Sequence, residues 1–325
     1  MRSVITGGAG FIGSHLVEHL LAQGDEVVVL DNMSTGDARN LDSALCPDLT
    51  IVPGSILDRA IVDSVVEDAD RVFHLAAAVG VRLIVDEPLS GLRTNIHGTE
   101  NVLDACLKTG AQLLLASTSE IYGKNTADSL SEDSDRILGS PLKSRWTYAA
   151  AKGIDEAFAH AYWREFGLEV SIVRLFNTVG PRQTGRYGMV VPNLVGQALR
   201  GEPLTVFGDG QQTRCFSYVK DVVPALVKVG EHPESPGRAF NLGGAREISI
   251  LELATRIVDV IGSSSEIVLV PYSEAYPDGF EDMRRRVPNN SAARALVGFE
   301  PATSIDEIIV AVAGYLSDRV LVGRA

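Results

Sequence analysis

Short runs of apolar residues recur along the first half of the chain. They are separated by longer stretches in which apolar positions repeat with a helical period. Nearly continuous apolar runs of this length are typical of strands buried on both faces of a parallel sheet. The runs lie at residues 3–6, 26–30, 49–52, 71–75, 112–117 and 169–175.

Helices are expected between these strands, near residues 11–23, 58–67, 92–109 and 146–166. Alternating strands and helices form βαβ units, whose right-handed crossovers generate a parallel sheet. The sequence therefore predicts an α/β fold, a Rossmann-type doubly wound parallel sheet with a smaller C-terminal substrate-binding lobe.

The pattern becomes more loop-rich after about residue 180. We expect an amphipathic helix over 248–262 that Ser249 opens, and a final helix near 304–317. Shorter elements are expected between them, including a helix over 221–229 and a strand within 238–244. The sheet domain is predicted to span 1–178, with 217–245 returning to it, and the lobe to comprise 179–216 and 246–325.

Composition narrows the classes of partner. The 325 residues are 45% hydrophobic and carry a formal net charge of −13, which argues against nucleic acid or an anionic membrane as a partner. No apolar run approaches the ~18 residues that a membrane-spanning helix needs. Three scattered cysteines and the absence of a signal peptide favour the reducing cytoplasm, and no cysteine or histidine cluster indicates a metal site.

A glycine-rich segment, TGGAGFIG, joins the first strand to the first helix at residues 6–13. Gly7 permits the tight turn, Gly10 lets the backbone approach a pyrophosphate, and Gly13 lets helix and strand pack closely. The helix N-terminus then faces the phosphates with free N–H groups. The second strand ends in Asp31, whose carboxylate suits ribose hydroxyls and would repel a 2′-phosphate, so NAD is favoured over NADP.

The fifth strand ends in STSE, residues 117–120, where an open parallel sheet places its ligands. Tyr148 and Lys152 stand four residues apart at a helix start, so both side chains leave one face. Tyr148 can serve as a general base if Lys152 and a positively charged nicotinamide lower the phenol pKa from ~10. Thr118 can hold the reacting hydroxyl. These groups suit hydride transfer to a nicotinamide.

The TGxxGxxG, STSE and YxxxK motifs together resemble the extended short-chain dehydrogenases/reductases over nearly the whole chain. The stretches RLFNTVGPR (174–182) and PLTVFGDGQQTRCFSYVKD (203–221) resemble the branch that modifies nucleotide sugars. The resemblance implies a homodimer built on a four-helix bundle, to which apolar positions such as Ala157, Phe158, Ala161 and Tyr162 contribute.

The residues expected to contact NAD lie at the ends of the predicted strands. They are Gly7, Gly10, Phe11, Ile12, Gly13, Asp31, Asn32, Ser34, Thr35, Gly36, Ser55, Ile56, Leu75, Ala76, Ala77, Asn95, Ser117, Tyr148 and Lys152. The resemblance also implies a set of residues that contact the UDP-sugar. These are Arg82, Thr118, Asn177, Val191, Asn193, Thr205, Val206, Phe207, Arg214 and Arg286.

Within this branch, two features resemble the UDP-glucuronate decarboxylases. Ser119 stands where dehydratases carry an Asp, and it is followed by Glu120. Arg286 precedes Pro288 by two residues, as in the bacterial lipid-A-modifying decarboxylases. The resemblance implies that Ser119, Glu120 and Arg286 join Thr118, Tyr148 and Lys152 as catalytic residues, and that UDP-xylose or a 4-keto pentose is the product.

Two alternatives remain open at the level of sequence. Gly80-Val81-Arg82 resembles the 4-epimerases, in which an arginine can hold a sugar carboxylate, and Met189 stands where animal and plant decarboxylases carry an Arg. UDP-glucuronate or UDP-glucose 4-epimerase is therefore the second hypothesis. A non-catalytic, NAD-sensing scaffold of the same fold is the third, which the intact Tyr148 and Lys152 disfavour.

Overall fold

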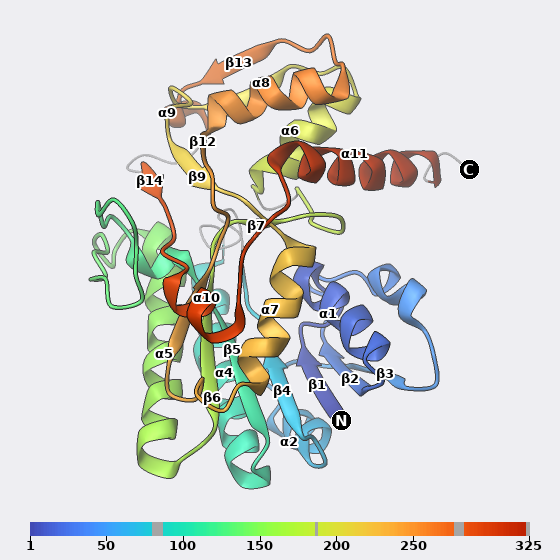
Figure 1. Cartoon of the computed structure of the whole chain (residues 1–325), viewed down its shortest axis with the longest axis vertical. Coiled ribbons are helices and arrows are strands. Elements are labelled where there is room, and N and C mark those ends of the chain that lie inside the picture. Colours follow the sequence, from blue (N-terminus) through green and yellow to red (C-terminus); the bar gives the residue numbers. More distant parts are fainter. Residues whose placement is uncertain (80–86, 186–187, 276–282, 323–325) are drawn as a thin grey trace.

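A parallel sheet of seven strands organises the N-terminal part of the protein (Figure 1). The computed structural model describes residues 1–79, 87–185, 188–275 and 283–322. The sheet strands are β1 (Arg2–Thr6), β2 (Glu26–Asp31), β3 (Leu49–Pro53), β4 (Arg71–His74), β5 (Gln112–Thr118), β6 (Val170–Leu175) and β11 (Ala239–Leu242). They lie in the order β11-β6-β5-β4-β1-β2-β3, and every neighbouring pair is parallel. The predicted doubly wound sheet is confirmed, and its order reverses between β1 and β4.

Helices cover both faces of this sheet. One face carries α1 (Phe11–Ala22), the 3₁₀ helix η1 (Ala38–Ala44), α7 (Val219–Glu231) and α10 (Ser291–Val297). The other carries α2 (Arg59–Val66), α4 (Pro88–Thr109) and α5 (Thr147–Phe166). The central strands are buried at nearly every position, because helices remove both faces from water. This explains why their sequences read as continuous apolar runs.

A smaller lobe has its own apolar core above the carboxyl edge of the sheet (Figure 1). Its helices are α6 (Val190–Leu199), α8 (Ile250–Ile261), α9 (Tyr272–Ala275) and α11 (Ile305–Val322). Its strands are β8 (Leu204–Phe207), β9 (Thr213–Cys215), β12 (Glu247–Ser249), β13 (Ile267–Val270) and β14 (Arg285–Arg286). The Ser249 side chain accepts a hydrogen bond from the Glu252 N–H at 3.0 Å and caps α8, as the sequence predicts.

Short elements connect the lobe to the sheet. The two-residue strands β7 (Thr178–Val179) and β10 (Ser217–Tyr218) pair in parallel where the chain leaves the sheet domain and returns to it. The 3₁₀ helices η2 (Ser119–Tyr122) and η3 (Ser144–Trp146) follow β5 and precede α5. Both carry side chains of the site described below.

One segment differs from the predicted division of the chain. Residues from 246 onward were expected to belong to the lobe, but α10 packs against α7 and β11 of the sheet domain. Ala293 and Phe299 are buried in the same apolar core as α1 and α7. This short helix has too few apolar residues to give a recognisable helical period in the sequence. Only its tertiary contacts show that it belongs to the sheet domain.

The described parts of the chain contain no helix with both the length and the hydropathy needed to cross a membrane. They also contain no group of three or more His, Cys, Asp or Glu side chains arranged to hold a metal ion.

The glycine-rich turn shows a steric constraint between α1 and the end of β1. Gly7 has a φ of 76°, in the left-handed region that favours glycine. A Cβ placed on Gly13 would lie 2.2 Å from the Gly7 carbonyl oxygen, so the first turn of α1 rests directly on the backbone of the loop. Any side chain at position 13 must push the helix away from the strand.

We predict opposite effects for two Gly→Ala substitutions in helices. Gly13→Ala lowers the melting temperature because backbone atoms must move to accept the methyl group. Gly314 is exposed on α11, and an added Cβ there would meet open space, so Gly314→Ala is neutral or stabilises by up to about 1 kcal/mol through helix propensity. Differential scanning calorimetry of both variants measures this. Equal melting temperatures would contradict the close packing inferred at Gly13.

Candidate active site

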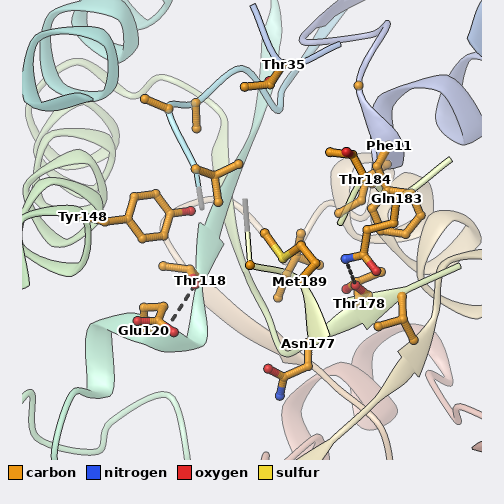
Figure 2. Close-up of a pocket in the computed structure, with 18 of the residues that line it drawn as sticks. Phe11, Thr35, Thr118, Glu120, Tyr148, Asn177, Thr178, Gln183, Thr184 and Met189 are labelled. Carbon is orange, nitrogen blue, oxygen red and sulfur yellow. Dashed lines mark hydrogen bonds between the residues drawn. The ribbon is translucent and has the colours of Figure 1, made fainter. Parts of the chain in front are cut away.

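A cavity of about 860 Å³ lies between the carboxyl edge of the sheet and the lobe. Its lining comes from the glycine-rich turn, the ends of β2, β4, β5 and β6, the start of α5, and residues of α6, β8, β9 and β14. Figure 2 shows Tyr148 and Glu120 on one side of it and Phe11 and Gln183 on the other, with Met189 between them. Ligands of open α/β sheets bind at this edge, beside the point where strand order reverses.

The sheet side of the cavity fits a dinucleotide. Gly7, Gly10 and Gly13 present bare backbone to the cavity, and a Cβ on Gly7 would lie 2.8 Å from the Ala76 nitrogen. Gly10 is the N-cap of α1, where no side chain satisfies the first N–H groups of the helix. These are the features by which a pyrophosphate is held at a helix N-terminus.

Asp31 has a structural task besides the expected contact with ribose. One carboxylate oxygen accepts the Ala9 N–H at 2.9 Å, and the other accepts the Met33 N–H at 2.8 Å. Burial raises the pKa of Asp31, although these two backbone hydrogen bonds oppose the shift. Each oxygen keeps a further lone pair, so Asp31 can tie the glycine-rich turn to β2 and still accept a ribose hydroxyl.

Tyr148 and Lys152 lie on the buried face of α5, as their spacing predicts. Tyr148 points into the cavity near Thr118, which ends β5 (Figure 2). Burial, reinforced by the charges of Glu120 and Asp155, holds the pKa of Tyr148 well above its usual range, although Thr118 opposes the shift. The chain's own groups therefore keep this phenol protonated. Its conversion to a base depends on positive charge brought by a ligand.

Lys152 is paired with a carboxylate of its own helix. Its Nζ donates to Asp155 Oδ2 at 3.0 Å, one helical turn further along α5. Lys152 is 2% exposed and Asp155 is 0% exposed, so this ion pair is fully removed from solvent.

Glu120 lies between two guanidinium groups at the lobe side of the cavity. Its Oε1 accepts from Arg286 at 2.5 Å, and its Oε2 is 2.6 Å from Arg145 Nη1. Burial alone would raise the pKa of Glu120, but Arg286 and Arg145, with Arg214 farther away, lower it to about 2. Glu120 is therefore a carboxylate at neutral pH and cannot donate a proton there. Its resting role is to orient both arginines.

Arg286 gathers further residues that the sequence singled out. Its Nη1 lies 3.2 Å from Ser119 Oγ, and its Nη2 lies 3.3 Å from Asn177 Oδ1. A parallel pairing of β14 with β9 places Arg286 beside Arg214. A guanidinium keeps its proton at all ordinary pH values, so Arg286 can deliver a proton only by orienting another donor, such as the Ser119 hydroxyl.

Most of the predicted site residues that the structure describes line this one cavity. They are Gly7, Gly10, Phe11, Ile12, Gly13, Asp31, Asn32, Ser34, Thr35, Ile56, Leu75, Ala76, Ala77, Ser117, Thr118, Ser119, Glu120, Tyr148, Lys152, Asn177, Val191, Asn193, Thr205, Phe207, Arg214 and Arg286. Residues more than 160 positions apart, such as Glu120 and Arg286, thus meet directly.

Four predicted residues are not among those that line the cavity. Val206 is fully buried in the core of the lobe, and Gly36 packs against Ala9. The Ser55 hydroxyl accepts the Leu57 N–H at 3.2 Å. The Asn95 side chain hydrogen-bonds the backbone of Ala78. Arg82, the proposed ligand of a sugar carboxylate, lies outside the described residues.

Arg145 and Asp155 are charged residues of the site that the sequence interpretation missed. Arg145 stands three residues before Tyr148, within the stretch SPLKSRWTY (140–148) that resembles the decarboxylases, but its contact with Glu120 is what identifies it as a residue of the site. Asp155 had a detectable signal. It follows Lys152 by three residues and therefore falls on the buried face of the same helix.

The chain is similar to known proteins over almost its whole length. Residues 3–243 match the NAD dependent epimerase/dehydratase family. A UDP-N-acetyl-alpha-D-glucosaminuronate decarboxylase of Bacillus cytotoxicus is 42% identical over 307 residues, which cover 94% of both chains. UDP-glucuronic acid decarboxylase 1 of Xenopus tropicalis is 38% identical over 94% of this chain and 70% of its own. The UDP-glucuronic acid 4-epimerase of Bacillus cereus, solved with UDP-glucuronic acid and NAD, superposes with a TM-score of 0.88 at 29% identity, covering 98% of this chain and 100% of its own.

Proposed function

Because the chain belongs to the NAD-dependent epimerase/dehydratase family, we propose that it is an NAD-dependent UDP-glucuronate decarboxylase. The observation that carries the proposal is the ionised Glu120 held between Arg145 and Arg286 beside Thr118 and Tyr148. The Bacillus and Xenopus relatives are named for removing the carboxyl group of a UDP-linked uronic acid. Both extend over almost the whole of this chain.

The first step removes hydrogen from carbon 4 of the sugar. Thr118 and Tyr148 hold the 4-hydroxyl, and the Tyr148 oxygen takes its proton. NAD bound here would supply a reversible acceptor for the hydrogen and electron pair of carbon 4, together with a positive charge near Tyr148. The glycine-rich turn, Asp31 and Lys152 are the residues that would hold it.

The second step is the loss of carbon dioxide. The 4-ketone stands β to the sugar carboxylate, so the bond between carbons 5 and 6 breaks and its electrons move into an enolate at oxygen 4. Tyr148, now carrying the proton, and Thr118 can donate hydrogen bonds to that oxygen as its charge develops. A proton then adds to carbon 5, from a donor that Arg286 and Ser119 orient.

The third step returns the ketone to an alcohol. Tyr148 gives its proton back to oxygen 4 while carbon 4 regains its hydrogen, which produces UDP-xylose. Release of the ketone before this step yields UDP-4-keto-pentose. The relative amounts depend on how long the cavity retains the ketone.

We propose that the site divides between the two parts of the chain. Residues 1–178 and 217–245, joined by α10, hold NAD, while the lobe holds the UDP group through residues such as Asn193 and Arg214. Arg214 is 7% exposed and lines the cavity, and a guanidinium is suited to paired hydrogen bonds with a diphosphate. A cytoplasmic location is proposed from the three free and scattered cysteines.

We predict that the purified protein converts UDP-glucuronate to UDP-xylose, UDP-4-keto-pentose, or both. Proton NMR of the reaction identifies the products, and a parallel reaction with the 2-acetamido substrate of the Bacillus relative defines the sugar preference. Tyr148→Phe is the control, because it removes the proton acceptor at nearly constant volume and lowers the rate by about 10²–10⁴-fold. UDP-galacturonate as the sole product would mean 4-epimerase activity. No turnover of any UDP-sugar would favour the scaffold.

We predict that Glu120→Gln and Arg286→Ala lower kcat for carbon dioxide release by about 10²-fold while raising KM much less. Arg285→Ala is the matched control. Arg285 is the neighbour of Arg286 on β14, but its Nε donates to Glu247 at 2.7 Å rather than to Glu120. Steady-state release of carbon dioxide measures both constants. If Glu120→Gln and Arg286→Ala change only KM, the two residues bind substrate and do not act on the reacting carbon.

We also propose a homodimer through α4 and α5, which pack side by side (Figure 1). Ile154 and Ala157 are exposed on α5 and Ala161 is only partly covered, so these positions form an apolar strip on the helix surface, while the partly covered Phe158 packs against the core beneath it. We predict a dimer by light scattering at micromolar concentration. Ala157→Glu should give monomers, because it places like charges near a two-fold axis, whereas Ala295→Glu, at an exposed position of α10, should not. A monomeric wild-type protein would contradict the proposal.

A further inference from the structure

A row of buried polar side chains extends from Lys152 to the glycine-rich turn. Lys152 donates to Asp155 Oδ2 at 3.0 Å, and Thr99 of α4 is close enough to Asp155 to favour the charged form of its carboxyl group. The Thr99 hydroxyl lies 3.0 Å from His74 Nε2, and His74 Nδ1 lies 2.7 Å from Thr6 Oγ1. All five residues are at most 2% exposed. Thr6 immediately precedes Gly7, so this row of polar side chains links α5, α4, β4 and β1 beneath the cavity.

The two charged members of this row of polar side chains, Lys152 and Asp155, lie at one end of it. Burial, reinforced by the charge of Lys152, lowers the pKa of His74 to about 3, so its imidazole is neutral and acts only through hydrogen bonds. Burial raises the pKa of Asp155, and Lys152 and Thr99 oppose that shift. The ammonium at 3.0 Å favours the carboxylate form of Asp155, and that carboxylate in turn favours the charged form of the buried amine.

Other charged groups near Tyr148 are engaged elsewhere. Glu120 on η2 pairs with Arg145 and Arg286, and Glu156 on α5 pairs with Arg174 of β6. The buried face of α4 contributes Thr99 and Asn95, which carry no charge, and β4 contributes the neutral His74. Among the described residues around the Tyr148–Lys152 face, Asp155 is thus the carboxylate paired with the lysine.

We propose that Asp155 is a positioning residue for oxidation of the sugar hydroxyl: it holds the Lys152 ammonium charged and in place, and its own charge sets the pH range in which Tyr148 accepts a proton. The inference rests on the 4-hydroxyl oxidation of the proposed function and is independent of whether carbon dioxide is then lost. Decarboxylation and epimerisation share that first step.

The direction of the pH effect follows from the sign of the charge. A neighbouring negative charge makes every acid group harder to ionise, so removing it makes both the phenol and the ammonium lose their protons at lower pH. Tyr148 must be able to lose its proton and Lys152 must keep its own. The whole range of activity therefore moves to lower pH when Asp155 is neutralised.

Asp155→Asn, Asp155→Ser and Asp155→Glu separate this role from simple packing. The rate at which added UDP-glucuronate reduces the bound cofactor is followed by absorbance as a function of pH. Both neutral variants should shift both limbs of the profile to lower pH by about one unit, and Asp155→Glu should retain the wild-type profile. Asp104→Asn is the control. It removes a carboxylate of α4 that accepts a hydrogen bond from Tyr162 of α5 at 2.6 Å, and it should leave the pH profile unchanged.

Melting temperature against pH provides a readout that does not depend on activity. In Asp155→Asn the ammonium is buried without its counter-charge, so the folded state binds that proton more weakly than the unfolded state does. Stability then rises with pH, and the deficit relative to wild type should shrink toward alkaline pH. In wild type the pair is present, and this recovery should be absent.

The outcomes separate the two proposals. A wild-type protein that never reduces its cofactor with any UDP-sugar refutes the proposed function. An active wild type, with an Asp155→Asn profile that is unshifted or a stability deficit that is constant with pH, overturns the role of Asp155. Failure of both neutral variants to fold would also overturn it, because the ion pair would then serve stability and not the pH range of the reaction.

Discussion

The geometry of the site depends on one buried ion pair between Arg174 of β6 and Glu156 of α5. The guanidinium donates to both carboxylate oxygens, at 3.0 Å from Nε and 2.7 Å from Nη2. Glu156 also accepts the Ser117 hydroxyl at 2.5 Å, and Arg174 reaches the Tyr122 hydroxyl at 2.9 Å. A single pair thus fixes α5 against the end of β5 and against η2. Removing one partner of such a pair typically costs about 3–5 kcal/mol, because it leaves a buried charge uncompensated.

Within this frame, two neighbouring groups on one side of the cavity have opposite tendencies to hold a proton. Burial and two nearby carboxylates make Tyr148 hold its proton tightly, whereas two arginines make Glu120 release its proton at a pH of about 2. Groups whose environments push their pKa values apart are typical of sites that move protons. This separation supports the proposed roles, in which Tyr148 exchanges a proton with oxygen 4 and Glu120 remains an anion that orients Arg145 and Arg286.

The sequence predicted the sheet and much of the site because both depend on local patterns. Strands buried on two faces must be apolar throughout, and residues such as Thr118 and Asp31 stand directly at strand ends. The partners of buried charges were not predictable in this way. Arg145 and Asp155 have meaning only through Glu120 and Lys152, and α10 is placed only by its contact with α7. Such pairings are decided by three-dimensional proximity, which a period of 2.0 or 3.6 does not encode.

Charge balance favours decarboxylation at this site over retention of the sugar carboxylate. When carbon dioxide leaves, negative charge moves from the carboxylate to oxygen 4, so a catalyst should bind the first weakly and stabilise the second. Glu120 already occupies Arg145 and Arg286 and reduces their net attraction for a substrate carboxylate. The donors of Thr118 and Tyr148 lie instead where oxygen 4 is expected. An epimerase needs the reverse arrangement, a cation committed to the carboxylate, because it must keep the β-keto acid intact while the ketone turns over.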